Sequence, residues 1–98
     1  MSIVVHASVL VAATTDTGPL GDWAEATLTE DDLIAPHLVL IEATNILRRL
    51  EAAHELTRIE ASAAQHEILE LDLLLLPFEP FAERVWELRT TVTSYAAW

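Results

Sequence analysis

The residues with the clearest potential for chemistry stand near the start of the chain. The β-branched run Ile3-Val4-Val5 ends in His6, which is followed by Ala7 and Ser8. A buried strand that ends in a polar residue delivers that side chain to the rim of a sheet, where α/β proteins place their sites. An enzyme of phosphodiester cleavage would need a carboxylate there to hold a divalent metal. The strand therefore predicts a site, and His6 indicates that the site is altered.

A second group of candidates follows Pro36 on the strongest predicted helix. Glu42 and Asn45 lie three residues apart on one side of this helix, within side-chain reach of each other. Arg48 and Arg49, one turn further along, form the only adjacent basic pair. These arginines could contact RNA phosphate or pair with neighbouring glutamates, as surface arginines commonly do. Asn45 could support Glu42 by hydrogen bonding or be an ordinary surface amide.

Two interpretations are open for His6 and Glu42. Imidazole suits Zn²⁺, Mn²⁺ or Ni²⁺ better than Mg²⁺, so the two residues could form a transition-metal site. Alternatively, His6 is a hydrogen-bonded histidine at the end of a strand, and Glu42 is one helix-face carboxylate among sixteen acidic residues. The sequence favours the structural interpretation for His6 and a residual site role for Glu42.

The charge of the chain limits its partners. Sixteen acidic residues face five arginines, which gives a formal net charge of −11. Nucleic-acid affinity depends mainly on neutralising phosphates with Lys and Arg, so this surface suits a general nucleic-acid binder poorly. A basic protein partner is easier to accommodate.

Composition and length indicate one packed domain. The chain has 98 residues, of which 52% are hydrophobic, and no cysteine, which excludes disulfides and thiolate chemistry. Neither a signal peptide nor a membrane span is recognisable, so a cytoplasmic protein with no membrane partner is expected.

The pattern of apolar residues predicts an α/β fold with a short parallel sheet flanked by helices. Strands are expected at residues 3–5, 33–35 and 72–78, the last of them central because it is apolar on both faces. Helical segments of suitable length for right-handed crossovers separate these strands. Thr57 and Glu60 form a capping box that starts a helix to about residue 71, antiparallel to the helix before it.

Some finer expectations concern single residues. Ser8 is expected to cap a short helical turn through residue 13, and residues 14–19 are expected to form a loop. A helix should begin at Pro80, with Phe81, Val85 and Leu88 on its buried side, and another at residues 95–98. The three tryptophans of the chain are expected in the core or at an interface: Trp23, Trp86 and Trp98.

Three segments in register resemble the PIN-domain endoribonucleases, and among them the VapC toxins of bacterial toxin–antitoxin pairs. The run from Ile3 to Val11 resembles the family's start "VVDASVLV". The run from Glu42 to Arg49 matches "E-x-x-N-x-L-R-R", and the run from Ser94 to Trp98 resembles "S-Y-D-A-W". The likeness covers essentially the whole chain and implies a PIN-like three-layer fold.

The resemblance also implies a set of site residues. Such enzymes use about four acidic residues around Mg²⁺ or Mn²⁺ to activate water against an RNA phosphodiester. The first acid position holds His6, the second Glu42 and the third Ala96, while the fourth would lie beyond Trp98. Ser8 matches a polar position that often assists the metal, and Asn45 one that supports the second acid. Metal binding should therefore be weak or absent.

The resulting expectation is a single, incomplete PIN-like domain over residues 1–98, with its C-terminal part missing and its nuclease activity impaired. Uncovered sheet surface predicts a homodimer. An antitoxin protein is the implied partner, and RNA is a partner only if activity is retained. The alternative is a non-catalytic module for antitoxin binding or oligomerisation.

Overall fold

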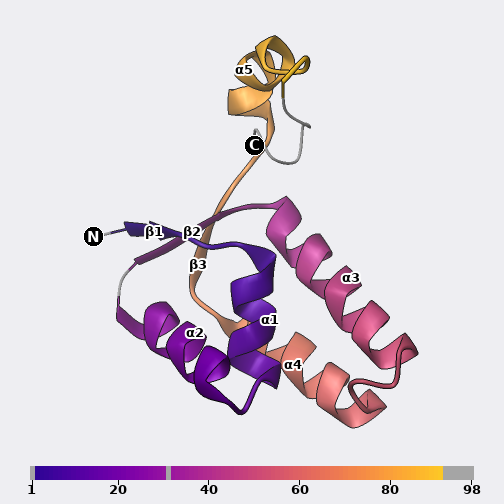
Figure 1. Ribbon diagram of the computed structural model, residues 1–98. Helices are drawn as coiled ribbons and strands as arrows, with labels where there is room; N and C mark the ends of the chain where they lie inside the picture. The colour runs from indigo at the N-terminus through magenta and orange to yellow at the C-terminus, as the bar shows by residue number, and fades with distance from the viewer. Residues whose placement is uncertain (1, 31, 92–98) are drawn as a thin grey trace.

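The protein has an α/β fold built on a three-stranded parallel sheet (Figure 1). The computed structural model describes residues 2–30 and 32–91. The elements in chain order are β1 (Ser2–Val4), α1 (Ala7–Thr15), α2 (Pro19–Glu30), β2 (Asp32–Pro36), α3 (Leu38–Ala52), α4 (Arg58–Glu70), β3 (Leu73–Leu76), the 3₁₀ helix η1 (Glu79–Phe81) and α5 (Ala82–Glu87).

The sheet has the order β1-β2-β3, so that β2 is the central strand. Val4 pairs with Ile34, and Ile34 pairs with Leu74, which fixes the register across all three strands. Because side chains alternate along a strand, these three residues share one face, and Leu33 and Ala35 share the other. Leu33 and Ala35 are buried in the main core.

The four long helices lie on the core face of the sheet (Figure 1). Helix α1 is at their centre and packs against α2, α3 and α4. Its Leu10 is fully buried, as is Ile68 of α4, and both belong to a single apolar cluster with β2. Helix α5 lies on the opposite side of the sheet, at the end of the segment that follows β3 (Figure 1). The predicted fold class, a short parallel sheet flanked by helices, is confirmed.

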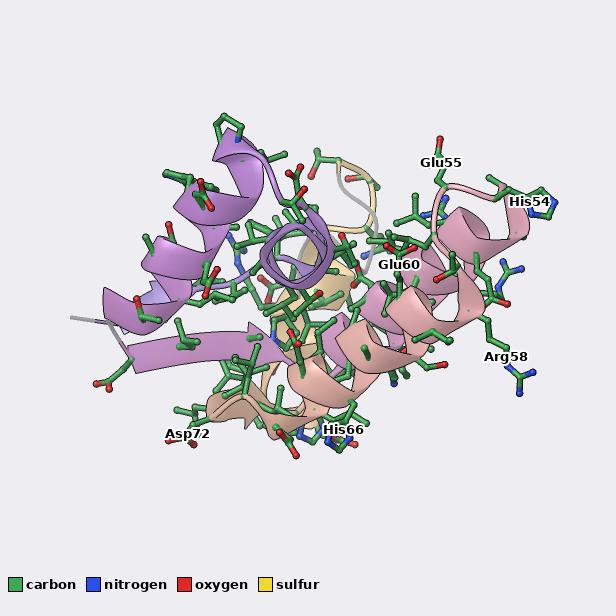
Figure 2. All side chains as sticks on the ribbon, turned by 90° about the horizontal axis from the view of Figure 1, so that it is seen from below. His54, Glu55, Arg58, Glu60, His66 and Asp72 are labelled. Atoms are coloured by element: carbon green, nitrogen blue, oxygen red, sulfur yellow. The ribbon has the colours of Figure 1, made fainter. Side chains whose placement is uncertain are left out.

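The α3–α4 hairpin is defined by its caps. Thr57 accepts a hydrogen bond from the Glu60 backbone N–H at 3.1 Å, and the Glu60 carboxylate accepts one from the Thr57 N–H at 2.8 Å. This reciprocal pair is the predicted capping box. The preceding helix ends in a left-handed His54, with φ of 60°. Figure 2 shows His54 and Arg58 at the outer end of the hairpin.

The start of α1 differs from the expectation. His6, not Ser8, is the N-cap residue, and its carbonyl accepts hydrogen bonds from the N–H groups of Val9 and Leu10. The helix begins earlier because the chain turns directly out of β1, so Ser8 lies inside the first turn. It also runs on to Thr15, whose hydroxyl donates to the Val11 carbonyl. The predicted loop over 14–19 is thus confined to the residues after Thr15.

The position of β3 and the exposure of two tryptophans also differ. Leu73–Leu76 is an edge strand, not a central one, and Leu74 is 61% exposed because nothing in the described chain packs on its face. Trp23 and Trp86 lie at the surface, which excludes the core and leaves an interface as the predicted location. Their helices bury smaller residues instead, Ala24 and Val85. Trp98 and the helix expected at residues 95–98 lie outside the described residues.

The α-helix after β3 starts later than predicted. Pro80 lies in η1, and α5 begins only at Ala82. Val85 is buried as expected, whereas Phe81 is exposed and Leu88 only half-buried. In the part of the chain that the structure describes, no helix has the length and apolar character needed to cross a membrane.

Candidate functional site

Two histidines follow adjacent strands at the carboxyl edge of the sheet, the predicted site residue His6 and His37. His6 follows β1, and the N–H of Val5 before it still donates to the Ile34 carbonyl of β2 at 2.8 Å. His37 follows β2 in the same way, and its N–H donates to the Leu76 carbonyl of β3 at 3.0 Å. Both histidines are exposed. Helices α1 and α3 begin at this edge (Figure 1), which is where parallel α/β sheets carry their sites.

His37 was missed as a candidate by sequence analysis. Its signal was present, because it follows the apolar strand β2 as His6 follows β1. The adjacent Pro36, a good residue for the start of a helix, instead forms the last position of the strand.

Glu42 lies one turn into α3, on a side of the helix that faces solvent. It lines an open cavity of about 340 Å³ together with Leu38, Ile41 and Asn45. The Glu42 side chain is exposed. The neighbouring Ile41 is 66% exposed. The cavity is therefore a shallow surface of one carboxylate, one amide and two aliphatic side chains.

Asn45 forms its side-chain hydrogen bonds with Arg48. The Oδ1 atom of Asn45 accepts from Nε of Arg48 at 3.1 Å and from Nη2 at 3.0 Å. This fork holds the guanidinium beside the cavity that Glu42 lines. The expected support of Glu42 by Asn45 stays a prediction. In the described chain, neither Arg48 nor Arg49 forms an ion pair with Glu51 or Glu55.

The remaining predicted positions add little to the site. Ser8 is exposed in the first turn of α1, next to the strand end that carries His6. Arg49 is exposed one residue after Arg48. Ala96 lies outside the described residues, and its methyl side chain has no atom that could ligate a metal.

The donor set does not fit a tightly bound Mg²⁺. This ion demands near-octahedral oxygen coordination and is usually held by one or two carboxylates plus substrate phosphates. Within residues 2–30 and 32–91, no three histidines or carboxylates come close enough to hold a metal together. Glu42, His6 and Ser8 therefore do not form a metal centre on their own, and we derive no catalytic step through an ion.

A second cavity, of about 480 Å³, opens at the other end of the sheet. Asp32 and Asp72 line it where β2 and β3 begin, among leucines of the strands. Figure 2 shows Asp72 at the edge of the molecule, close to the start of β3. Within the described chain, this second cavity also lacks a third metal-ligating side chain beside Asp32 and Asp72. The amino edge is therefore not a better candidate than the carboxyl edge.

Glu60, a carboxyl of the described chain whose pKa is shifted, belongs to the α3–α4 hairpin and not to these sites. Hydrogen bonds from the Thr57 backbone and side chain lower the pKa of the Glu60 carboxyl. Figure 2 shows Glu60 on the α4 side of the hairpin. This shift reflects the capping box and has no connection with the carboxyl edge of the sheet.

Comparison with known families decides what this arrangement belongs to. The PIN domain family model matches residues 3–93, which is nearly the whole chain. The chain belongs to the PIN domain family. No individually curated protein matches the sequence. PIN domains are associated with nuclease activity in general and with divalent metals, and in this PIN domain the matched region includes His6, Glu42 and Asn45.

Proposed function

We propose that this PIN domain is a homologue of the VapC-type toxins whose endoribonuclease site is impaired. The observation that carries the proposal is the isolation of Glu42 at the carboxyl edge of the sheet. Within the described residues, no group of three metal-ligating side chains includes it. Where the resembled motif has its first acid, this chain has His6.

The chemistry of the family explains why the loss matters. Hydrolysis of a phosphodiester bond by hard divalent cations requires oxygen ligands that hold the ions against the attacking water and the leaving oxygen. The residues at the two further matched positions, His6 and Ala96, supply an imidazole and a methyl group. A lone exposed carboxylate such as Glu42 can bind a hydrated cation only loosely. Single-strand RNA cleavage at the level of an intact site is therefore not expected.

Contact with RNA, if retained, would depend on Arg48 and Arg49. Arg48 is oriented by its two hydrogen bonds to Asn45, next to the cavity that contains Glu42. Two arginines can offset the net charge of −11 only within a local patch. We expect RNA affinity to be low and to fall steeply with added salt.

A non-catalytic role is the second candidate, and the surface around Glu42 favours it. Ile41 presents a large exposed aliphatic side chain directly beside the carboxylate. Such a combination suits a basic and partly apolar segment of another protein, as an antitoxin would provide. Since two acidic positions are lost, we expect this contact to be weaker than at an intact acidic site. The exposed apolar residues also support a homodimer.

The experiment is cleavage of a panel of single-stranded RNAs with Mg²⁺ and then with Mn²⁺. The wild-type protein is compared with Glu42→Ala and with the matched control Glu51→Ala, which removes an exposed glutamate from the same helix. All three proteins are first shown to be folded by circular dichroism. We expect all three to leave the RNA intact at equal background levels. Cleavage by wild type and Glu51→Ala that disappears in Glu42→Ala would show a working site and contradict the proposal.

A further inference from the structure

Helix α2 presents an apolar row and an acidic row to solvent. Leu20 is 58% exposed and Trp23, three residues later, is 57% exposed. Asp22 and Glu25 repeat this spacing and are also exposed, and residues three apart are neighbours on a helix surface. The exposed Ala26 lies three residues after Trp23 and four after Asp22, so it separates the two rows. We call these five residues the α2 surface.

The inner side of α2 fixes the helix in place. The helix buries Ala24 and packs mainly on α1. Its first turn lies tightly against the end of α1, because the Asp16 carbonyl oxygen occupies the space that a Cβ of Gly21 would need. The α2 surface on the outer side is therefore held rigidly and points away from the core.

No positive charge close to α2 balances its acidic row. None of the five arginines precedes Arg48, whereas seven of the sixteen acidic residues do. Helix α1, the main neighbour of α2, contains no charged residue. Within the described residues, neither Asp22 nor Glu25 forms an ion pair. The acidic row is therefore available to a basic group from outside the chain.

The arginines lie on other parts of the molecule. Figure 1 shows α1 between α2 and α3, the helix that carries Arg48 and Arg49. Figure 2 shows Arg58 at the end of the molecule opposite α2. Arg84 lies on α5, across the sheet (Figure 1). Salt screens exposed charges that are more than about 8 Å apart at physiological ionic strength, so these arginines do not cancel the negative potential at the α2 surface.

The Trp23 ring is also free to receive a cation. The other described tryptophan, Trp86, already has Arg89 over its ring, with the Cζ atom 4.3 Å from the ring centroid. In residues 2–30 and 32–91, no cation lies over Trp23. The face of an indole ring attracts a lysine or arginine. An exposed indole beside an acidic row therefore suits a segment that carries both apolar and basic side chains.

We propose that the α2 surface binds a basic amphipathic helix of another protein. The apolar side chains of the partner pack on Leu20 and Trp23, and its lysines or arginines face Asp22 and Glu25. Because the Ala26 side chain is small, the partner can approach α2 closely between the two rows. A partner helix as long as the 12 residues of α2 covers the surface from end to end.

Charge complementarity selects this partner over others. A nucleic acid or an anionic membrane brings negative charge against Asp22 and Glu25, and so does a second copy that docks through its own α2 surface. Like charges in contact disfavour such partners, whereas a basic segment gains attraction and a faster association. The contact is separate from the one proposed around Glu42, which lies on α3, and it does not depend on the state of the nuclease site.

The test uses a synthetic peptide of leucine and lysine, ordered so that its helix has one apolar face and one basic face. Its binding to the protein is measured by the fluorescence anisotropy of a label on the peptide. Wild type should bind this peptide more tightly than a peptide of the same composition in scrambled order, which has no apolar face. All protein variants are first shown to be folded by circular dichroism.

The first comparison removes an exposed indole from each of two helices. Trp23→Ala should weaken binding of the leucine–lysine peptide about fivefold, because the apolar and cation contacts of the ring are lost. Trp86→Ala is the matched control, since Trp86 is also exposed but lies on α5. It should bind the peptide as wild type does.

The second comparison reverses the charge of the acidic row. Asp22→Lys combined with Glu25→Lys should lose the leucine–lysine peptide and bind the corresponding leucine–glutamate peptide instead. Glu51→Lys combined with Glu67→Lys changes the net charge by the same amount, at exposed positions on α3 and α4. This control should still prefer the leucine–lysine peptide.

Three results would overturn the proposal in distinguishable ways. The first is wild-type protein that does not bind the leucine–lysine peptide. The second is an equal loss in the two charge-reversed proteins, which would mean general attraction to the net charge of −11. The third is binding that survives Trp23→Ala and disappears in Glu42→Ala. That result would assign the partner to the surface on α3 and leave the second candidate function standing.

Discussion

The carboxamide of Asn45 accepts both hydrogen bonds of its fork from Arg48, which lies one turn after it on α3. Glu42 lies one turn before Asn45, at the same distance along the helix. The sequence allows Asn45 to pair in either direction, and the structure shows the pair with the arginine. Within the described residues, the Arg48 guanidinium near the Glu42 cavity is therefore bound by the amide of Asn45 and not by a carboxylate.

This pair should be measurable by a double-mutant cycle. We expect Asn45→Ala and Arg48→Ala to be coupled by about 0.2–0.5 kcal/mol in urea unfolding, as is usual for exposed pairs on one helix. The corresponding cycle between Glu42→Ala and Asn45→Ala tests the expected support of Glu42 by Asn45 and should show a smaller coupling. A larger coupling of Asn45 with Glu42 than with Arg48 would contradict this geometry.

Gly21 is required where α2 passes close to the end of α1. A Cβ atom there would lie 1.8 Å from the Asp16 carbonyl oxygen, which is backbone and cannot move aside. Gly21→Ala should therefore destabilise the protein by about 1–3 kcal/mol or more, as overpacking does. Gly18→Ala is the matched control, since its Cβ would meet only the Asp16 side-chain oxygen at 3.2 Å. Equal midpoints of urea unfolding for the two variants would refute this contact.

His54 occupies a position that favours glycine. Its φ is 60°, its N–H donates to the Glu51 carbonyl at 3.0 Å, and the N–H of Glu55 donates to the Leu50 carbonyl at 2.9 Å. These are the two hydrogen bonds of a Schellman motif. His54→Gly should raise the free energy of unfolding by about 1 kcal/mol, because glycine adopts the left-handed region without steric cost.

Ala53→Gly provides the comparison for His54→Gly. Ala53 has a φ of −83°, where glycine brings no steric relief, so this variant should be slightly destabilised. A gain of stability in Ala53→Gly, or a loss in His54→Gly, would rule out relief of the left-handed conformation as the cause.

The capping box predicts a specific pH dependence. Hydrogen bonds from the Thr57 backbone and side chain lower the pKa of Glu60 below the ordinary value of a glutamate. A carboxyl with a lowered pKa in the folded state stabilises the protein above its unfolded pKa, and this contribution is lost as the pH falls through the folded pKa. The difference in thermal midpoint between wild type and Glu60→Gln should therefore be constant near neutral pH and shrink on acidification below 4.5. A difference that grows on acidification would contradict this sign.

Much of the fold was predictable because local signals agreed with tertiary structure. The Thr57–Glu60 box, the helix after Pro36 and the strands around Val4 and Ile34 were all found where the pattern indicated. The edge position of β3 was not predictable from its leucines. A run of four leucines predicts a strand that is buried on both faces. Whether both faces are buried depends on which elements pack on them, and Leu74 is exposed.

The position of His6 at a strand end was predictable, but the contacts of Asn45 were not. The apolar run before His6 was enough to place this residue at the carboxyl edge of the sheet. The partner of Asn45 was not predictable, because helical spacing is symmetric between Glu42 and Arg48. The cap of α1 shifted from Ser8 to His6 because strand and helix are joined with almost no loop, a feature that propensity alone does not encode.

The most direct test of the impaired site is a calorimetric titration of the folded protein with Mn²⁺. The account predicts no saturable binding by wild type, and a heat profile that Glu42→Ala leaves unchanged. Saturable Mn²⁺ binding that Glu42→Ala abolishes, while Glu51→Ala retains it, would show a functional metal centre and contradict the account.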